Sequence, residues 1–395
     1  MSKIFLSNSG IGKYLFCPRS YLLHYIRKIR PLTFSSNLVF GLAVDNALNY
    51  MLDNLDNKNV LKEALKEFDR HFEQGTDSRG EIVDMPLNPN IEYARMDFDP
   101  DLLEKSDWKE LFSYDSNFFD TKKEVEESMK TTEDEEGNEI LGKKWIEIDE
   151  EKRSILNYAT WKCLSKKGKL LLEAYYNDLL PYIKEVIAVQ MDISIEDENG
   201  DVLPGVLDAV VRLHGNKFGL DYDPVVILDN KTSSAKYDTH SVVNSAQLAK
   251  YKAILNIKNQ DPEDEWKHHI DLCAFAVMVK KLKKDKKKVC KECGHIGLGT
   301  HKTCDNIIDE KRCNGEWEKT CKIECVTQFV LDEIPEEKVI ESLEDADMVK
   351  TAIEMNIFPK NQSNCKNLFG RACPYINFCV NGDMHGLLIK EANKD

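Results

Sequence analysis

Apolar side chains recur at helical spacing along the first part of the chain. Residues 9–30 place aromatic and aliphatic residues three or four positions apart. Pro18 favours the start of a second short helix there, and Cys17 immediately precedes it. The same periodicity predicts further helices over residues 38–55, 60–73 and 148–185.

The period changes to that of β-strands near residue 186. Strands are predicted over residues 186–195, 202–213, 225–231, 270–279 and near 323–331. Helices are predicted between and after them, over residues 242–256 and 335–355. Helices, a strand cluster, a helix and a returning strand predict an α/β core. Residues 76–150 have an acidic, mixed pattern, in which TEDEEGNE at 132–139 indicates a solvated turn or hairpin.

Length and charge narrow the class of protein. The chain has 395 residues, 42% of them hydrophobic, so a large core can form. A net charge of −15 disfavours nonspecific adsorption to nucleic acid, although local basic patches still bind phosphate. No apolar run reaches the roughly 18–20 residues of a membrane span, and the N-terminus has no signal core. We therefore expect an intracellular, cytoplasmic protein that makes no contact with a membrane.

Ten of the 12 cysteines fall in three places: at Cys17, between residues 290 and 325, and between residues 365 and 379. In a reducing cytosol, such clustering predicts ligands of metals or clusters rather than disulfides.

The most informative stretch is VVILDNKTSS, an apolar strand that ends in Asp229, Asn230 and Lys231. Alternation along a strand makes Asp229 and Lys231 point the same way. The preceding strand, GVLDAVVR, places Asp208 on a neighbouring strand. Two carboxylates on adjacent strands are ligands for Mg²⁺ or Mn²⁺, and a nearby ammonium can position or deprotonate an attacking water. The alternative for each acid is a solvated strand end.

Two pairs of residues at i and i+4 accompany these acids. Gln247 and Tyr251 share one helix face, and so do Gly41 and Asp45 on an earlier helix. Gly41 is expected to permit a close approach of the backbone.

In this order, the motifs resemble the PD-(D/E)XK nuclease superfamily, specifically its RecB-like branch, which includes CRISPR-associated and phage exonucleases. The family's Gly-x-x-Asp motif matches Gly205 to Asp208, its acid-x-Lys motif matches Asp229 and Lys231, and its Gln-x-x-x-Tyr motif matches Gln247 and Tyr251. The resemblance covers most of the chain except residues 76–150 and the cysteine-rich insert. It implies a restriction-endonuclease-like core with a helical N-terminal region.

The sequence departs from the family at two positions. Asp45 stands where the family usually has histidine, which shifts the expected metal preference toward harder ions. Gln190 stands where the preceding strand often carries glutamate, so this position adds no charge.

The resemblance implies a deoxyribonuclease that hydrolyses phosphodiester bonds in single strands or at DNA ends, during recombination, repair or phage DNA processing. Asp208 and Asp229 would bind Mg²⁺ or Mn²⁺, Asp45 would add a third ligand, and Lys231 would orient water. Gln247 and Tyr251 would shape the site or contact the strand. No phosphate-binding motif of a helicase is present, so a helicase or recombination partner would be a separate chain. A noncatalytic DNA-binding or assembly subunit and a ribonuclease are the alternatives.

One distant cysteine and three near the C-terminus resemble the iron–sulfur members of this branch. The resemblance implies a [4Fe-4S] cluster that joins the chain ends, because four thiolates are the ligands that such a cluster needs. A zinc site with the same ligands and unliganded thiols remain alternatives. The four cysteines are Cys17, Cys365, Cys373 and Cys379.

The insert carries Cys290-x-x-Cys293 followed by Cys304 and Cys313, the ligand supply of a zinc ribbon that binds Zn²⁺. His295 or His301 is an alternative fourth ligand, and Cys321 and Cys325 are interpreted as ordinary thiols. Seven lysines in KKLKKDKKK (280–288) predict either a solvated hairpin arm or contact with phosphate. We thus predict four regions: a helical region (1–185), a nuclease core (186–280), the zinc-ribbon insert (281–325) and a C-terminal strand, helix and iron–sulfur tail (326–395).

Overall fold

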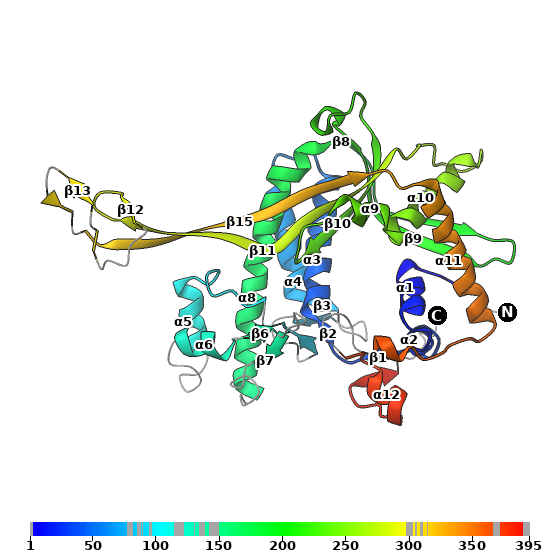
Figure 1. Cartoon of the computed structure of the whole chain (residues 1–395), viewed down its shortest axis with the longest axis horizontal. Helices are drawn as coiled ribbons and strands as arrows, with labels where there is room; N and C mark the ends of the chain where they lie inside the picture. Colours follow the sequence, from blue (N-terminus) through cyan, green and yellow to red (C-terminus); the bar gives the residue numbers. More distant parts are fainter. Residues whose placement is uncertain are drawn as a thin grey trace.

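The protein combines helices and strands around one large mixed sheet, from which a long arm extends (Figure 1). The computed structural model describes residues 3–76, 82–84, 88, 90–94, 97–113, 122–129, 131–133, 139–141, 150–297, 303–304, 306–308, 311–313, 315–365 and 372–389. Among these residues, no helix is both long and apolar enough to cross a membrane.

The sheet has the order β15-β11-β10-β9-β8, and β12 pairs with the far end of β11. Its strands are β8 (Ile183–Glu196), β9 (Val202–Leu213), β10 (Val225–Ser233), β11 (Leu272–Cys290), β12 (Ile296–Gly297) and β15 (Trp317–Asp332). Only β10 and β11 run parallel; the other pairs are antiparallel. The parallel step requires a crossover, which helices α9 (Thr239–Val243) and α10 (Ala246–Gln260) supply.

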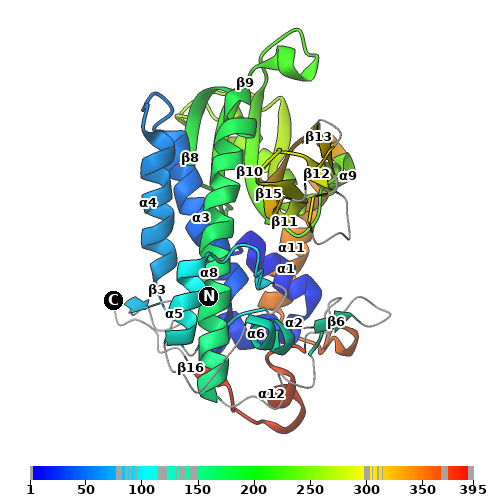
Figure 2. The ribbon, with the colours of Figure 1, turned by 90° about the vertical axis from the view of Figure 1, so that its left-hand side faces the viewer.

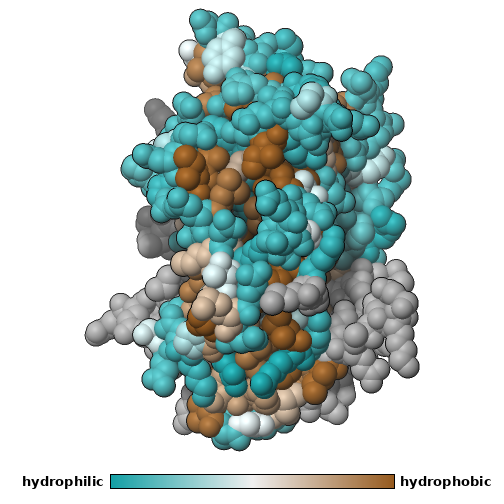
Figure 3. Space-filling view, turned by 90° about the vertical axis from the view of Figure 1, so that its right-hand side faces the viewer, coloured by the Kyte–Doolittle hydropathy of each residue, from teal (hydrophilic) through white to brown (hydrophobic). Residues whose placement is uncertain are grey.

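Helices cover both faces of the sheet, so its central strands are apolar on both sides. One face packs against α3 (Ser36–Asp53), α4 (Val60–Glu73) and α8 (Glu150–Ala174), which stand side by side in Figure 2. The other face packs against α10 and α11 (Glu336–Glu354). The side of the molecule that carries these two helices has a mainly hydrophilic surface, with apolar side chains in separate areas (Figure 3).

Side-chain caps set where several helices begin. Ser35 accepts a hydrogen bond from the Asn37 amide at the start of α3, and Ser245 accepts one from the Leu248 amide at the start of α10. These oxygens satisfy amides that have no partner within the helix.

The two ends of the chain meet below the sheet. α1 (Asn8–Phe16), α2 (Pro18–Tyr21) and η1 (Leu22–Ile26) pack near the C-terminal part of α11, where Ile11 and Tyr14 share a cluster with Val349. β1 (Ile29–Pro31) then pairs with β16 (Leu387–Ile389). Between α11 and β16 lie η6 (Gln362–Asn364) and α12 (Ile376–Asn381).

A smaller cluster forms where α5 and α6 pack against α8, and it also receives Leu282 of β11 and Ile323 of β15. The remaining short elements are α5 (Lys105–Ser113), α6 (Lys122–Ser128), η3 (Tyr175–Leu179), η4 (Leu180–Tyr182), η5 (Gly215–Phe218), β2 (Phe34–Ser35), β3 (Gln74–Thr76), β4 (Ile82–Asp84), β5 (Ile91–Glu92), β6 (Thr131–Glu133), β7 (Glu139–Leu141), β13 (Ile307–Ile308) and β14 (Lys311–Arg312).

The predicted α/β class and the helical N-terminal region are confirmed, and most predicted elements appear within a few residues of their predicted bounds. At the turn or hairpin expected over 132–139, β6 and β7 pair antiparallel, and residues 134–138 lie outside the described residues. One strand differs from its prediction. β11 does not end near 279 but runs through the lysine-rich segment to Cys290, because it pairs with β15 on both sides of a register shift between Val279 and Lys283. The four predicted regions stay a prediction.

Gly168 of α8 lies against the ring of Phe68 on α4. An added methyl group at this position would lie 2.2 Å from Phe68 Cζ, far inside van der Waals contact. We expect Gly168→Ala to destabilise the fold by about 1–3 kcal/mol, the usual cost of overpacking. Chemical denaturation measures this loss, and Gly12→Ala is the control because no atom lies within 4 Å of the added methyl group. Equal unfolding free energies for the two variants would contradict the packing of α4 on α8.

Candidate functional site

Strands β9 and β10 separate at the point where the predicted acids lie. Their ladder ends at the pair Leu228–Ala209. Beyond this pair, a side chain replaces the backbone acceptor: Asp208 Oδ2 accepts a hydrogen bond of 2.8 Å from the Asn230 amide. The next residue, Lys231, places its Nζ 2.5 Å from Asp229 Oδ2. Asp229 and Lys231 therefore face the same way, as strand alternation predicts.

Asp229 is 1% exposed, and its Oδ1 accepts no hydrogen bond from any residue that the structure describes. Burial raises the pKa of this carboxyl to about 6, the Lys231 ammonium opposes the rise, and the Asp208 carboxylate adds to it. Burial also raises the pKa of Asp208. For Lys231, burial disfavours the charged form, but the carboxylates outweigh burial and raise its pKa.

Helix α3 brings Asp45 to these residues. Burial raises the pKa of Asp45 to about 7, and the Asp208 and Asp229 carboxylates contribute to the rise. Three carboxyl groups from α3, β9 and β10 thus share their surroundings with one ammonium. If all three are ionised, the group carries an excess of two negative charges, which is costly in a poorly solvated place. Carboxylate oxygens are the donors that a hard divalent cation takes, although the oxygens of these three acids do not all lie within 4.8 Å of one another in this structure.

The two glycines at the site differ in their structural role. A methyl group at Gly41 would meet only Thr232 Oγ1 at 3.9 Å, an ordinary contact, so the expectation that this glycine permits close approach is wrong. At Gly205, a methyl group would lie 2.6 Å from Tyr251 Cε1. It is Gly205 that lets α10 place the Tyr251 ring against β9.

Gln247 and Tyr251 meet on α10, where Gln247 Nε2 donates a hydrogen bond of 3.0 Å to the Tyr251 hydroxyl. Burial raises the pKa of Tyr251, and the Asp229 and Asp208 carboxylates contribute, which places the phenol within their field. Gln190, by contrast, is an exposed residue in the left-handed backbone region, with φ of 46°.

Two buried polar residues, one near the acids and one beside the Tyr251 ring, have no signal in the sequence. Tyr175 is the first residue of the π-helical turn η3, a feature often found at functional sites. Its hydroxyl is fully buried, has no hydrogen-bond partner among the described residues, and has a raised pKa from burial and from the Asp208 and Asp45 carboxylates. Lys250 is 1% exposed, and its Nζ donates to the Pro204 carbonyl oxygen at 3.2 Å. Both residues lie in apolar runs that predict only core.

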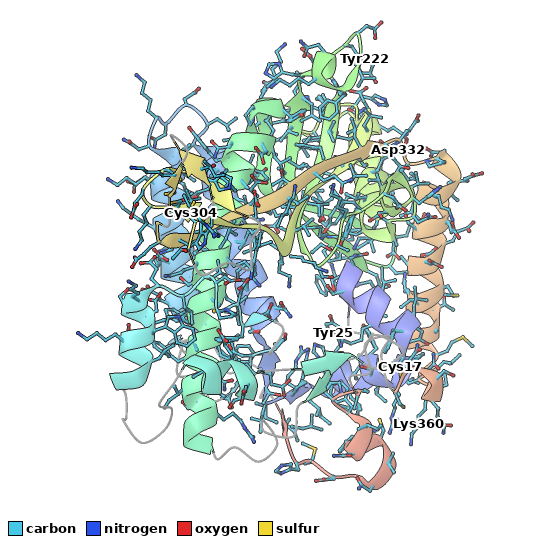
Figure 4. All side chains as sticks on the ribbon, turned by 60° about the vertical axis from the view of Figure 1, so that its left-hand side comes forward. Cys17, Tyr25, Tyr222, Cys304, Asp332 and Lys360 are labelled. Atoms are coloured by element: carbon cyan, nitrogen blue, oxygen red, sulfur yellow. The ribbon has the colours of Figure 1, made fainter. Side chains whose placement is uncertain are left out.

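The four cysteines at the chain ends line one cavity of about 300 Å³. Cys17 caps the start of α2, and Cys373 donates its amide to the Cys365 carbonyl oxygen at 2.7 Å. Lys360 lies at the same cavity and donates to the Cys379 carbonyl oxygen at 2.6 Å. Figure 4 shows Cys17 and Lys360 in one region of the molecule, and Cys304 in another.

The second group of cysteines gathers at the tip of the arm. The Sγ atoms of Cys290, Cys293, Cys304 and Cys313 all lie within 4.8 Å of one another, so these residues can hold a metal ion or an iron–sulfur cluster. The Cys290–Cys313 and Cys293–Cys304 Sγ pairs are 3.6 Å and 3.7 Å apart.

The cysteines complete this group without a histidine. His295 contributes through its backbone: its carbonyl oxygen accepts from the Cys290 amide, and its backbone also hydrogen-bonds Cys293. His301 lies outside the described residues. Cys325 instead packs against the large core.

Comparison with known protein families and with curated proteins finds no match for this chain. Its function must therefore be inferred from the acidic group at the end of β10 and from the two groups of cysteines.

Asp45→Asn removes a carboxyl group whose pKa rises from an ordinary 3.8 to about 7 on folding. A raised folded-state pKa stabilises the fold below the unfolded value, and this contribution is lost as pH rises from about 4 to about 7. Without added divalent cations, we expect the Tm of Asp45→Asn minus the Tm of the wild type to be larger at pH 8 than at pH 5.5. Thermal melts at both pH values measure this difference. A difference that does not change with pH would contradict the burial of Asp45 beside the other acids.

Proposed function

We propose that the chain is a metal-dependent deoxyribonuclease of the PD-(D/E)XK, RecB-like type. The observation that carries the proposal is the electrostatic interaction of Asp45, Asp208 and Asp229, from three separate elements, with one another and with the half-buried Lys231. Their mutual repulsion and the buried Asp229 Oδ1 without a partner are explained if a divalent cation completes the group.

Each residue then has a role set by its position. Asp45, Asp208 and Asp229 would hold Mg²⁺ or Mn²⁺, which when bound supplies charge stabilisation to the phosphate in an in-line displacement. Lys231 orients the attacking water through its ammonium, which the Asp229 carboxylate holds in place at 2.5 Å. The Gln247–Tyr251 pair forms the wall of the site on the α10 side and positions the strand. Asp45 in place of a nitrogen ligand gives the site an all-oxygen character that favours Mg²⁺ and Mn²⁺.

The proposed substrate is DNA, as single strands or at ends, with hydrolysis that serves recombination, repair or phage DNA processing. Any unwinding would come from a separate helicase. A noncatalytic DNA-binding subunit is the second candidate, because Asp45 departs from the family's histidine and the net charge is −15.

End-labelled DNA with Mg²⁺ or Mn²⁺ tests the catalytic proposal. We expect Asp229→Ala and Lys231→Ala each to lower the cleavage rate by about 100-fold or more, since loss of a metal ligand or its partner costs several kcal/mol at the transition state. Asp221→Ala, at an exposed acid before β10, is the matched control and should cleave normally. A wild-type protein that binds DNA but is inert with both cations would favour the noncatalytic subunit.

We further propose that the two cysteine groups hold different cofactors. A tetrahedral zinc ion with Zn–S bonds of about 2.3 Å needs sulfur atoms about 3.8 Å apart, close to the spacing at the arm tip. Among the residues that the structure describes, no three thiols at the chain ends lie within 4.8 Å of one another, yet all four line one cavity. A wider set around a cavity suits a [4Fe-4S] cluster, which would join the chain ends.

Metal analysis of protein purified without oxygen tests this assignment. We expect about four iron and one zinc per chain, with absorption near roughly 400 nm. Cys373→Ser should lose the iron and keep the zinc, whereas Cys293→Ser should lose the zinc and keep the iron. Zinc in both groups, or retention of iron in Cys373→Ser, would contradict it.

A further inference from the structure

The arm, residues 280–324, is a two-stranded ribbon formed by the outer part of β11, the outer part of β15 and the tip between them. Figure 1 shows it extending away from the rest of the molecule. Eight residue pairs, from Lys283–Glu324 to Cys290–Trp317, make up its ladder. At ~3.3 Å per residue, this ladder is about 26 Å long.

The arm begins beside the end of strand β10, where the acidic group lies. β10 and β11 run parallel, and their register pairs Lys231 with Val277 and Ser233 with Val279. The arm therefore begins with Lys280, immediately beyond the end of β10. A polymer that leaves the acidic group in this direction passes along the ribbon.

Among the lysines of this run whose side chains the structure describes, two contact the body and two are exposed. Lys280 Nζ donates to Asn37 Oδ1 at 2.6 Å, and Lys284 Nζ lies 2.5 Å from Asp99 Oδ1 and 2.8 Å from Asp101 Oδ2. Leu282, between them, packs into the cluster of α5, α6 and α8. The even-numbered positions thus fix the root of the arm to the body.

Lys281 and Lys283 are exposed. Lys281 lies where the β11–β15 register shifts, and Lys283 resumes the pairing opposite Glu324. Because Glu324 is two residues from Val326, the partner of Val279, Lys283 lies on the same face of β11 as Val279. Lys231 Nζ lies 5.9 Å from the centre of the Phe275 ring on that face, so Lys283 and the lysine of the acidic group lie on one face of the sheet.

Charge sets the arm apart from the rest of the chain. Residues 280–324 contain 13 Lys and Arg against 8 Asp and Glu, in a chain whose net charge is −15. Such a local excess attracts a polyanion to a surface that otherwise repels it. At the tip, Lys311 and Arg312 of β14 are exposed as well.

We propose that the arm is a binding element for duplex DNA, which it holds beside the acidic group so that an adjoining single strand enters the site. A two-stranded ribbon fits the major groove of B-form DNA, and its ladder matches about eight base pairs. The cysteine group at the tip keeps the two strands together where no body packs against them. The inference rests on the proposed function, because it assumes that DNA is the substrate.

Binding tests the arm separately from cleavage. All variants are compared in the Asp229→Ala background, by fluorescence anisotropy with a labelled duplex that carries a single-stranded overhang. We expect Lys281→Gln/Lys283→Gln to weaken binding about tenfold or more near 0.1 M salt and to flatten the slope of log K against log salt by about 1.8, the value for two phosphate contacts. Lys58→Gln/Lys62→Gln removes the same charge from exposed positions at and just before α4 and should change neither value.

A single strand of about five nucleotides has no major groove and, at ~3.4 Å per nucleotide, is shorter than the arm, so it should bind both double variants equally. If the Lys281/Lys283 variant binds the duplex with the affinity and salt slope of its parent, the arm does not bind DNA. Binding of a protein partner is then the role left for the arm. The proposed nuclease stands in that case. If the parent binds no DNA of either kind, the proposed function itself fails.

Discussion

The grouping of three carboxyl groups around one ammonium in a poorly solvated place at the end of β10 is the constraint on which the rest of the site depends. Three elements carry the acids Asp45, Asp208 and Asp229. Apolar contacts on both faces of the sheet, and not the acids, hold these elements together. Their carboxyl groups are brought together as a consequence, and one ammonium cannot neutralise them. These carboxyl groups therefore destabilise the fold, and a bound divalent cation would offset that loss.

The separation of β9 and β10 shows how the sheet accommodates that charge. A continued ladder would place the backbone where the Asp208 carboxylate now accepts from the Asn230 amide. On the opposite side, Gly205 leaves room for the Tyr251 ring, and α10 can approach β9 closely enough to close the site. The end of the β9–β10 ladder and the absence of a side chain at Gly205 thus create the space in which the polar groups meet.

The arm and the chain ends extend this centre in two directions. The parallel step from β10 to β11 carries the sheet past the acidic group into the ribbon, whose root is fixed by Lys280, Leu282 and Lys284. The chain ends offer only small apolar clusters of their own, so the pairing of β1 with β16 and the cavity lined by four thiols give them further means of holding together. Both cysteine groups lie where little core is available, which is where covalent or metal links contribute most.

The sequence by itself determined much of the fold and the main residues of the site. Strand alternation is a local property, so it placed Asp229 and Lys231 on one face, and helical periodicity put Asp45 on a helix. The Cys290-x-x-Cys293 spacing likewise indicated a metal site at the insert. Only the tertiary structure decided which glycine is needed for packing, and that Tyr175 is buried near the acids and Lys250 beside the Tyr251 ring. It also decided that Lys280 and Lys284 anchor the arm while Lys281 and Lys283 are exposed. The physical reason is that each of these depends on contacts between elements far apart in the chain, which no local pattern contains.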